Sequence, residues 1–184
     1  FKVYQATSSK GQGSKRGGYT TKKMDACIKD DKIWSSNMQN GKPTALEIGS
    51  LSSKNCISTC KIFGDVTRLD LNSQVPGKIE KQDFFDRPMP TSNNDRFDLV
   101  SCSLVVNFVP KPSLRGEMLL RITKFLKEPE NAFDHKPLLF FVIPLPCVIN
   151  SRYCNKEIMD AIFKNLGFTC VRSHDSHKLA YWLL

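Results

Sequence analysis

The sequence predicts an α/β protein with a doubly wound, Rossmann-like sheet of seven mostly parallel strands, an antiparallel last strand and helices on both faces. Apolar runs of strand length alternate along the chain with apolar stripes at helical spacing. One early run ends in Glu47 and Gly49, and another ends in Asp70, 21 residues after that glycine. Two final runs, residues 168–172 and 178–184, are spaced to pair as a hairpin. This alternation is typical of a parallel sheet built from βα units.

The elements follow from local patterns in chain order. Residues 52–60 predict a short helix or an irregular turn. Ser113 is a suitable N-cap for a helix, and Gly167 is suited to end another. Short apolar runs predict the first five strands at residues 44–48, 66–71, 77–80, 97–106 and 138–143. Helical stripes are formed by Met118, Ile122, Phe125 and Leu126, and later by Ile158, Met159, Ile162, Phe163 and Leu166.

Positive charge is concentrated in the first part of the chain. The net charge is +9, and residues 1–42 hold nine lysines and arginines against three aspartates. We therefore expect a basic leader over residues 1–42 and a folded domain over residues 43–184. An excess of positive charge suits a polyanion such as RNA, although a solvated flexible arm explains the same composition.

The sequence does not indicate a membrane protein, a metal-binding protein or a disulfide-rich protein. The longest apolar run, residues 137–149, is shorter than a spanning helix and is interrupted by prolines, so no membrane partner is expected. The seven cysteines form no C-x-x-C pair, and the three histidines do not cluster with acids. Neither a metal site nor a disulfide framework is therefore expected.

Acidic residues and a glycine at strand ends predict a site for a cofactor that contains adenosine. Gly49 lets the backbone approach a ligand, Glu47 stands beside it, and Asp70 is placed to accept from ribose hydroxyls. The turn after Gly49 lacks the three glycines that pass a pyrophosphate. A glycine-poor turn favours S-adenosylmethionine, which has no phosphate. Ordinary strand ends, with Asp70 as a turn-forming residue, are the alternative.

Further residues complete the expected cofactor set. Asp83 and Phe84 follow the third strand, where a carboxylate and an apolar side chain would meet adenine. A solvated Asp beside a core Phe is an equally good interpretation. Leu71, next to Asp70, and Ser103, late in the fourth strand, are the remaining candidates.

Two segments predict a place for a substrate base. Asn107 and Phe108 follow the fourth strand in a polar-aromatic-proline turn, in which the amide would bind the base edge and the ring would stack. Arg152 and Tyr153 end a proline-rich run at the carboxyl end of the fifth strand, where ligands of such sheets bind. Arg152 would hold a phosphate and Tyr153 would stack on a base. The alternatives are a loop with a buried aromatic and a capped helix start.

These pieces together resemble the fungal 25S ribosomal RNA adenine-N1 methyltransferase family, whose animal relatives include an S-adenosylmethionine sensor upstream of TOR signalling. The resemblance spans nearly the whole chain, and its most specific part is the proline-cysteine run that ends in Asn-Ser-Arg-Tyr. The matching stretches begin at Tyr4, Leu46, Arg68, Gln82, Ser103, Arg115 and Leu145.

The resemblance implies a Rossmann-like class I methyltransferase fold and Gly49 and Asp70 as principal cofactor residues. It implies methyl transfer to N1 of an adenine in large-subunit ribosomal RNA, free or within a pre-ribosome. We therefore expect a monomer in the nucleus and nucleolus. A non-catalytic sensor of S-adenosylmethionine is the main alternative. A third, cytosine-C5 methylation, requires Cys102 or Cys147 as nucleophile, and buried structural cysteines are the favoured interpretation.

Overall fold

The computed structural model describes residues 41–73, 75–130 and 136–184. The described chain forms two compact units that divide between Arg87 and Pro88, and each unit is described by itself. The predicted leader, residues 1–42, lies outside the described residues except for Gly41 and Lys42.

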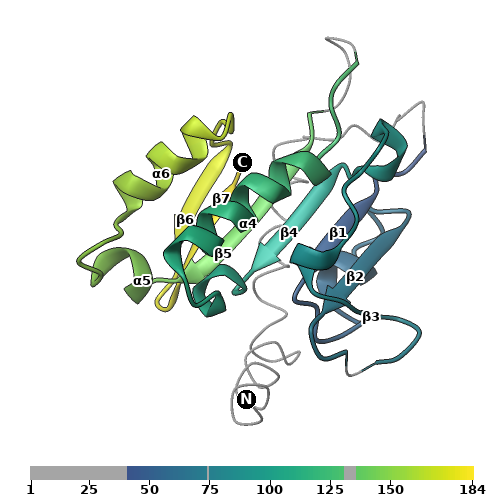
Figure 1. Cartoon of the computed structure of the whole chain (residues 1–184), viewed down its shortest axis with the longest axis horizontal. Coiled ribbons are helices and arrows are strands. Elements are labelled where there is room, and N and C mark those ends of the chain that lie inside the picture. Colours follow the sequence, from purple (N-terminus) through teal and green to yellow (C-terminus); the bar gives the residue numbers. More distant parts are fainter. Residues whose placement is uncertain (1–40, 74, 131–135) are drawn as a thin grey trace. The chain divides into compact units, whose positions relative to one another are not determined.

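The first unit, up to Arg87, contains three parallel strands in the order β3-β2-β1 (Figure 1). Its buried side chains include Leu46, Leu69 and Ile79. Because strands β1 and β2 are parallel, their carboxyl ends lie at the same edge, which brings Gly49 and Asp70 to neighbouring positions. The elements are β1 (Ala45–Ile48), α3 (Cys56–Thr59), β2 (Val66–Asp70), β3 (Glu80–Lys81) and the 3-10 helix η1 (Phe84–Asp86).

The second unit, from Pro88, contains four strands in the order β4-β5-β7-β6. Strand β4 is parallel to β5, and β7 is antiparallel to both β5 and β6. The two units together supply the seven strands that the sequence predicts, and the antiparallel last strand is confirmed. The strands are β4 (Leu99–Ser103), β5 (Leu138–Pro144), β6 (Arg172–Asp175) and β7 (Leu179–Leu183).

Helices of the second unit cover its strands, and α4 lies across β4 and β5 in Figure 1. The first predicted helical stripe is confirmed, since Met118, Ile122, Phe125 and Leu126 are all buried. The second is confirmed only in part, because Met159 and Phe163 are buried while Ile158 is 42% exposed. Gly167 ends the second helix with a φ of 89°, as expected. The helices are α4 (Pro112–Phe125), α5 (Pro146–Ile149) and α6 (Lys156–Asn165), with 3-10 helices η2 (Asn93–Asp95) and η3 (Val106–Phe108).

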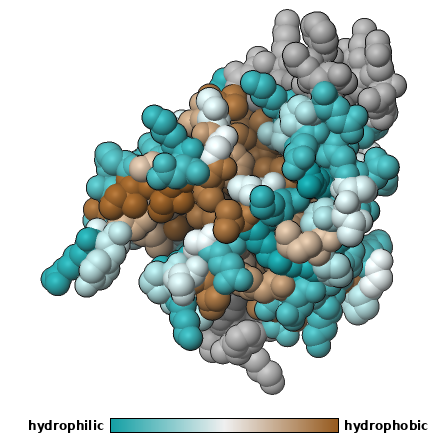
Figure 2. All heavy atoms as spheres, turned by 45° about the horizontal axis from the view of Figure 1, so that its top comes forward, coloured by the Kyte–Doolittle hydropathy of each residue, from teal (hydrophilic) through white to brown (hydrophobic). Residues whose placement is uncertain are grey.

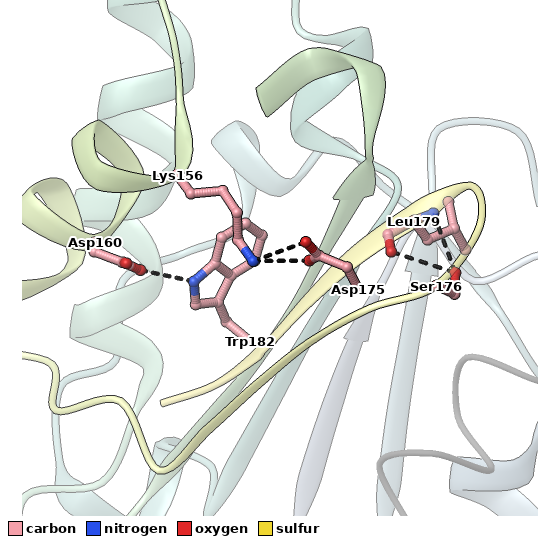
Figure 3. Close-up of polar contacts among 6 residues, drawn as sticks. All are labelled: Lys156, Asp160, Asp175, Ser176, Leu179 and Trp182. Atoms are coloured by element: carbon pink, nitrogen blue, oxygen red, sulfur yellow. Dashed lines mark hydrogen bonds and ion pairs between the residues drawn. The ribbon is translucent and has the colours of Figure 1, made fainter. Parts of the chain in front are cut away.

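Trp182 connects α6 to the β6–β7 hairpin. Its ring is fully buried and lies 5.9 Å from the Phe141 ring and 5.7 Å from the Phe163 ring. Its indole Nε1 donates to Asp160 Oδ1 at 2.8 Å (Figure 3). Lys156 Nζ lies 5.6 Å from the centre of the indole and pairs with both carboxylate oxygens of Asp175 at 2.9 Å. The indole therefore has apolar contacts on its rings and a polar partner at its N–H.

Several predicted boundaries are wrong. The fourth strand ends at Ser103 rather than 106, because Leu104 adopts a φ of 59° and turns the chain. The third strand is Glu80–Lys81 rather than 77–80, because Gly77 occupies a turn with a φ of 79°. The sixth strand begins at Arg172, four residues later than expected, and all its residues are exposed.

The predicted helix cap is also wrong. Helix α4 begins two residues earlier than an N-cap at Ser113 predicts, with Lys111 as N-cap and Pro112 as the first helical residue. Proline suits this position because its missing N–H would have no helical partner there. The segments between β2 and β4 contain 3-10 helices and no α-helix among the described residues, so the predicted alternation of strands and helices is incomplete there.

Hydrophilic side chains cover much of the visible face in Figure 2, interrupted by an area of apolar surface. Exposed large apolar side chains of the second unit include Phe108, Leu120, Ile149, Tyr153, Ile158 and Val171. Among the described residues, no helix combines the length and apolar character needed to cross a membrane.

Candidate functional site

The turn after β1 is held by a buried carboxylate. Glu47 is 7% exposed, and its two carboxylate oxygens accept from Ser50 Oγ at 2.7 Å and from Asn55 Nδ2 at 2.8 Å. Burial raises the pKa of Glu47, while these hydrogen bonds and the Arg68 charge oppose that shift. Since both oxygens already have partners within the turn, the structure supports Glu47 as a residue that orders the turn.

Gly49 adopts a backbone conformation that favours glycine. Its φ is 73°, in the left-handed region that side chains with a Cβ rarely occupy. The N–H groups of Gly49 and Ser50 both donate to the carbonyl of Leu69, at 2.9 and 3.0 Å. The glycine turn is thereby attached to the end of β2, next to Asp70.

Asp70 ends β2, and one of its two carboxylate oxygens already accepts a hydrogen bond. Asp70 Oδ1 accepts from the Asn72 N–H at 2.7 Å, which forms a local turn. The other oxygen, Oδ2, has no hydrogen-bond partner among the described residues. Burial raises the pKa of Asp70, and the Asn72 hydrogen bond opposes that shift. Leu71 follows and is 53% exposed, so an acceptor and an apolar residue stand side by side.

Asp83 and Phe84 lie just after β3, as expected, but differ in accessibility. Asp83 is half-buried and caps η1 by accepting from the Phe85 N–H at 2.9 Å. Phe84 is only 2% exposed, which leaves little ring surface for a ligand. This burial favours the core role that the sequence left open for Phe84.

Leu104 is a feature of the site that sequence reasoning missed. Ser103 ends β4 half-buried, and Leu104 follows it with a φ of 59°, an uncommon conformation for a bulky residue. The Leu104 N–H donates to the carbonyl of Val142 at 2.9 Å and so fixes the turn to β5. Such strain concentrates at functional sites. Leucine gives no sequence signal for it, because glycine is the residue expected there.

Asn107 and Phe108 lie together on η3, immediately after this turn. Asn107 Oδ1 is buried and has no hydrogen-bond partner among the described residues. A buried acceptor without a partner costs roughly 1–3 kcal/mol, so its retention points to a ligand that donates to it. Phe108 is 48% exposed.

Arg152 and Tyr153 lie in the linker between α5 and α6, and both are exposed. Tyr153 is 89% exposed. The linker turns at Ser151, whose Oγ accepts from the N–H groups of Tyr153 and Cys154 at 3.2 Å. Both side chains are therefore accessible, as a role in binding substrate requires.

The described residues bear on the cysteine alternative through Cys102. Cys102 is fully buried, and burial raises the pKa of its thiol to about 12. A nucleophilic thiolate would therefore be scarce at neutral pH. Among the described residues, no cluster of His, Cys, Asp or Glu is arranged to hold a metal ion.

Solved structures show the class of fold. The chain resembles an S-adenosylmethionine-dependent methyltransferase from Clostridium acetobutylicum, with a TM-score of 0.65 and 12% identity over 98% of each chain. It also resembles the magnesium protoporphyrin IX methyltransferase of Synechocystis, solved with bound S-adenosylmethionine, with a TM-score of 0.58 and 12% identity over 94% of this chain and 82% of that one. The fold is that of the class I methyltransferases.

The chain belongs to the Bmt2 family, described as 25S rRNA (adenine(2142)-N(1))-methyltransferase, which it matches over residues 1–184. It is 44% identical over 184 residues to the Saccharomyces cerevisiae protein named 25S rRNA (adenine(2142)-N(1))-methyltransferase. It is 40% identical over 182 residues to the Schizosaccharomyces pombe 25S rRNA adenine-N(1) methyltransferase. The first match includes all of this chain and the second 98% of it. The chain spans only 50% of the length of the first relative and 64% of the second.

Proposed function

We propose that this chain transfers a methyl group from S-adenosylmethionine to N1 of an adenine in large-subunit ribosomal RNA. The observation that carries the proposal is the match of residues 1–184 to the family of adenine-N1 methyltransferases. The fold of the chain supports it, since fold neighbours are methyltransferases. The unpartnered Asn107 acceptor supports a ligand with an N–H donor, and the exocyclic amine of adenine is one.

The first unit has residues that fit the cofactor. The positive φ of Gly49 keeps the end of β1 free of a side chain, and Asp70 retains a carboxylate oxygen for a ribose hydroxyl. Leu71 offers apolar surface beside it. S-adenosylmethionine, when bound, supplies an electrophilic methyl group on a sulfonium. Asp83 is a candidate for a further polar contact, and Glu47 for ordering the turn.

The second unit has residues that fit an adenine. N1 of adenine bears a lone pair and needs no deprotonation to accept a methyl group, so catalysis is mainly orientation of the base. Asn107 Oδ1 would accept from the exocyclic amine and would favour the cationic product, while Phe108 stacks on the ring. Because N1 lies on the Watson–Crick edge, the base must be unpaired or flipped out. Tyr153 and Arg152 would bind the flanking strand.

Methyl transfer from labelled S-adenosylmethionine to unmodified large-subunit ribosomal RNA tests the proposal, followed by nucleoside analysis. Label in N1-methyladenosine supports it. Binding of S-adenosylmethionine without methyl transfer contradicts the proposal. It favours a non-catalytic sensor of S-adenosylmethionine, which needs no contact with RNA. We further propose a monomer that works on ribosomal RNA or a pre-ribosome in the nucleus and nucleolus, as part of ribosome biogenesis.

Asn107→Ala is expected to lower kcat about tenfold to a hundredfold, because the base loses a hydrogen bond that orients N1. Affinity for S-adenosylmethionine should be unchanged. Asn107→Asp keeps an acceptor at the same place and should retain more activity than the alanine variant. Asn165→Ala, an exposed asparagine at the end of α6, is the control. The proposed pocket is wrong if Asn107→Ala and Tyr153→Ala each leave turnover unchanged.

Cys102→Ala is expected to retain methyl transfer to adenine within a few-fold, because a thiol with a pKa of about 12 is neutral under assay conditions. The variant isolates the cytosine-C5 alternative, which requires a thiolate to attack the base. Nucleoside analysis of the product should show no 5-methylcytidine with either protein. Label in 5-methylcytidine that disappears with Cys102→Ala or Cys147→Ala would establish the cysteine mechanism instead.

A further inference from the structure

Arg115 holds the end of the η3 turn, which carries Asn107 and Phe108. It lies in the first part of α4, exposed to solvent. Its Nε donates to the carbonyl of Val109 at 2.7 Å. Val109 is the residue after η3, so this hydrogen bond fixes the end of the turn that positions Asn107 and Phe108.

The other side of the Arg115 guanidinium remains available. Among the described residues, its terminal nitrogens, Nη1 and Nη2, form no hydrogen bond, and no carboxylate pairs with them. Burial and the neighbouring Cys147 raise the pKa of the Cys154 thiol, and the Arg115 charge opposes that shift. Arg115 therefore lies within electrostatic range of the α5–α6 linker, where Arg152 and Tyr153 precede Cys154.

The surroundings of Arg115 favour an anion. Lys111 is four residues earlier and exposed, and residues at this spacing share a helix face. The N-terminus of α4 has no side-chain cap, so the helix dipole adds positive potential near this face. Glu117 is two residues further along α4, and that spacing turns it away from the Arg115 face.

We propose that Arg115 binds a backbone phosphate of the RNA strand next to the target adenosine while it holds the turn at Val109. An arginine suits both tasks, because its guanidinium has five N–H donors in a fixed plane and pairs with phosphate through two of them. Lysine retains the charge but has no planar fork, so it cannot reproduce both contacts. The inference rests on the proposed function, since it assigns the phosphate contact to the same RNA substrate.

The test uses the full chain and two readouts for Arg115→Gln, Arg115→Lys and the control Lys124→Gln. Lys124 is an exposed residue of the last turn of α4, so the control removes one charge from the same helix. The first readout is binding of an unstructured, adenine-containing oligoribonucleotide at several salt concentrations. The second is kcat and KM for methyl transfer to ribosomal RNA. Thermal melting and cofactor binding establish that each variant is folded.

Arg115→Gln is expected to weaken oligonucleotide binding and raise KM about tenfold. It should also reduce the slope of log affinity against log salt by about 0.7, the value for one phosphate contact on a single strand. Arg115→Lys should keep that slope and lower kcat, because it keeps the charge and loses the geometry at Val109. Lys124→Gln should match the unmodified chain.

The inference is overturned if Arg115→Gln and Lys124→Gln show the same slope and affinity for the oligonucleotide. That result is independent of catalysis, so it differs from a failure of the proposed function, in which the unmodified chain transfers no methyl group to RNA. A slope that falls equally with Arg115→Lys and Arg115→Gln would also contradict a phosphate contact, since lysine retains the charge.

Discussion

Asp70→Ala is expected to weaken S-adenosylmethionine binding by about a hundredfold and to abolish methyl transfer at ordinary cofactor concentrations. The substitution removes the oxygen available to a ribose hydroxyl and also the acceptor of the Asn72 N–H. A hydrogen bond to a charged group contributes roughly 1.5–3 kcal/mol, and the loss of the local turn adds to it. Isothermal titration of each variant with S-adenosylmethionine measures the effect.

Two further variants separate the ligand contact from the turn. Asp70→Asn keeps an oxygen that accepts from Asn72 and should therefore keep the turn, with an intermediate loss of affinity. Asp86→Ala removes an exposed aspartate of the same unit and should bind as the unmodified chain does. The assignment of Asp70 is wrong if its alanine variant binds the cofactor as tightly as Asp86→Ala does.

Affinity for S-adenosylmethionine should depend on pH through Asp70, and at a higher pH than is usual for an aspartate. Burial raises the pKa of Asp70, and the charged form is the stronger acceptor for a ribose hydroxyl. Affinity for the cofactor should therefore fall as the pH is lowered through that raised pKa. Asp70→Asn should lose this dependence, which a titration series across acidic pH would show.

Trp182→Ala is expected to destabilise the chain by about 3–5 kcal/mol, the usual cost of removing a large buried aromatic. Trp182 is fully buried against Phe141 and Phe163 and donates to Asp160 (Figure 3). Trp182→Phe keeps ring contacts and loses the indole N–H, so its effect should be smaller. Denaturant unfolding followed by circular dichroism measures the free energy of unfolding of each variant.

Tyr153→Ala is the matched control for this experiment. Tyr153 is an aromatic residue of the same unit that is 89% exposed, and its removal should change the free energy of unfolding by no more than about 0.5 kcal/mol. If Trp182→Ala were no more destabilising than Tyr153→Ala, Trp182 would not anchor the hairpin to α6. The two variants also differ in function, because Tyr153 is proposed to contact RNA.

The buried parallel strands and the amphipathic helices were predictable because their sequence patterns report burial directly. Strand β5 was expected at 138–143 and is Leu138–Pro144, since a run buried on both faces is continuously apolar. Strand β6 was misplaced for the opposite reason. Its residues Arg172–Asp175 are polar and exposed, and pairing with β7 rather than burial decides where they lie.

The candidate site was predictable only in part. Asp70 and Asn107 could be predicted as candidates because acid and amide side chains at strand ends are informative in this class of sheet. The left-handed Leu104 was not predicted, because its turn is fixed by a hydrogen bond to Val142 on another strand. The hydrogen bond from Arg115 to Val109 spans only six residues, but it depends on how the start of α4 folds back on the η3 turn. The satisfied carboxylate of Glu47 and the burial of Phe84 likewise required the packed structure.

Leu104 sets a limit on how far this chain can be made more stable without changing what it does. Glycine at this position would relieve about 1 kcal/mol of backbone strain, so a redesign guided by stability would choose it. Glycine would also let the peptide between β4 and η3 sample other conformations, and Asn107 would then approach a base from varying directions. Stability thus favours glycine at position 104, whereas a fixed direction for Asn107 favours leucine. Such a trade-off is expected wherever local strain holds the residues of a site in place.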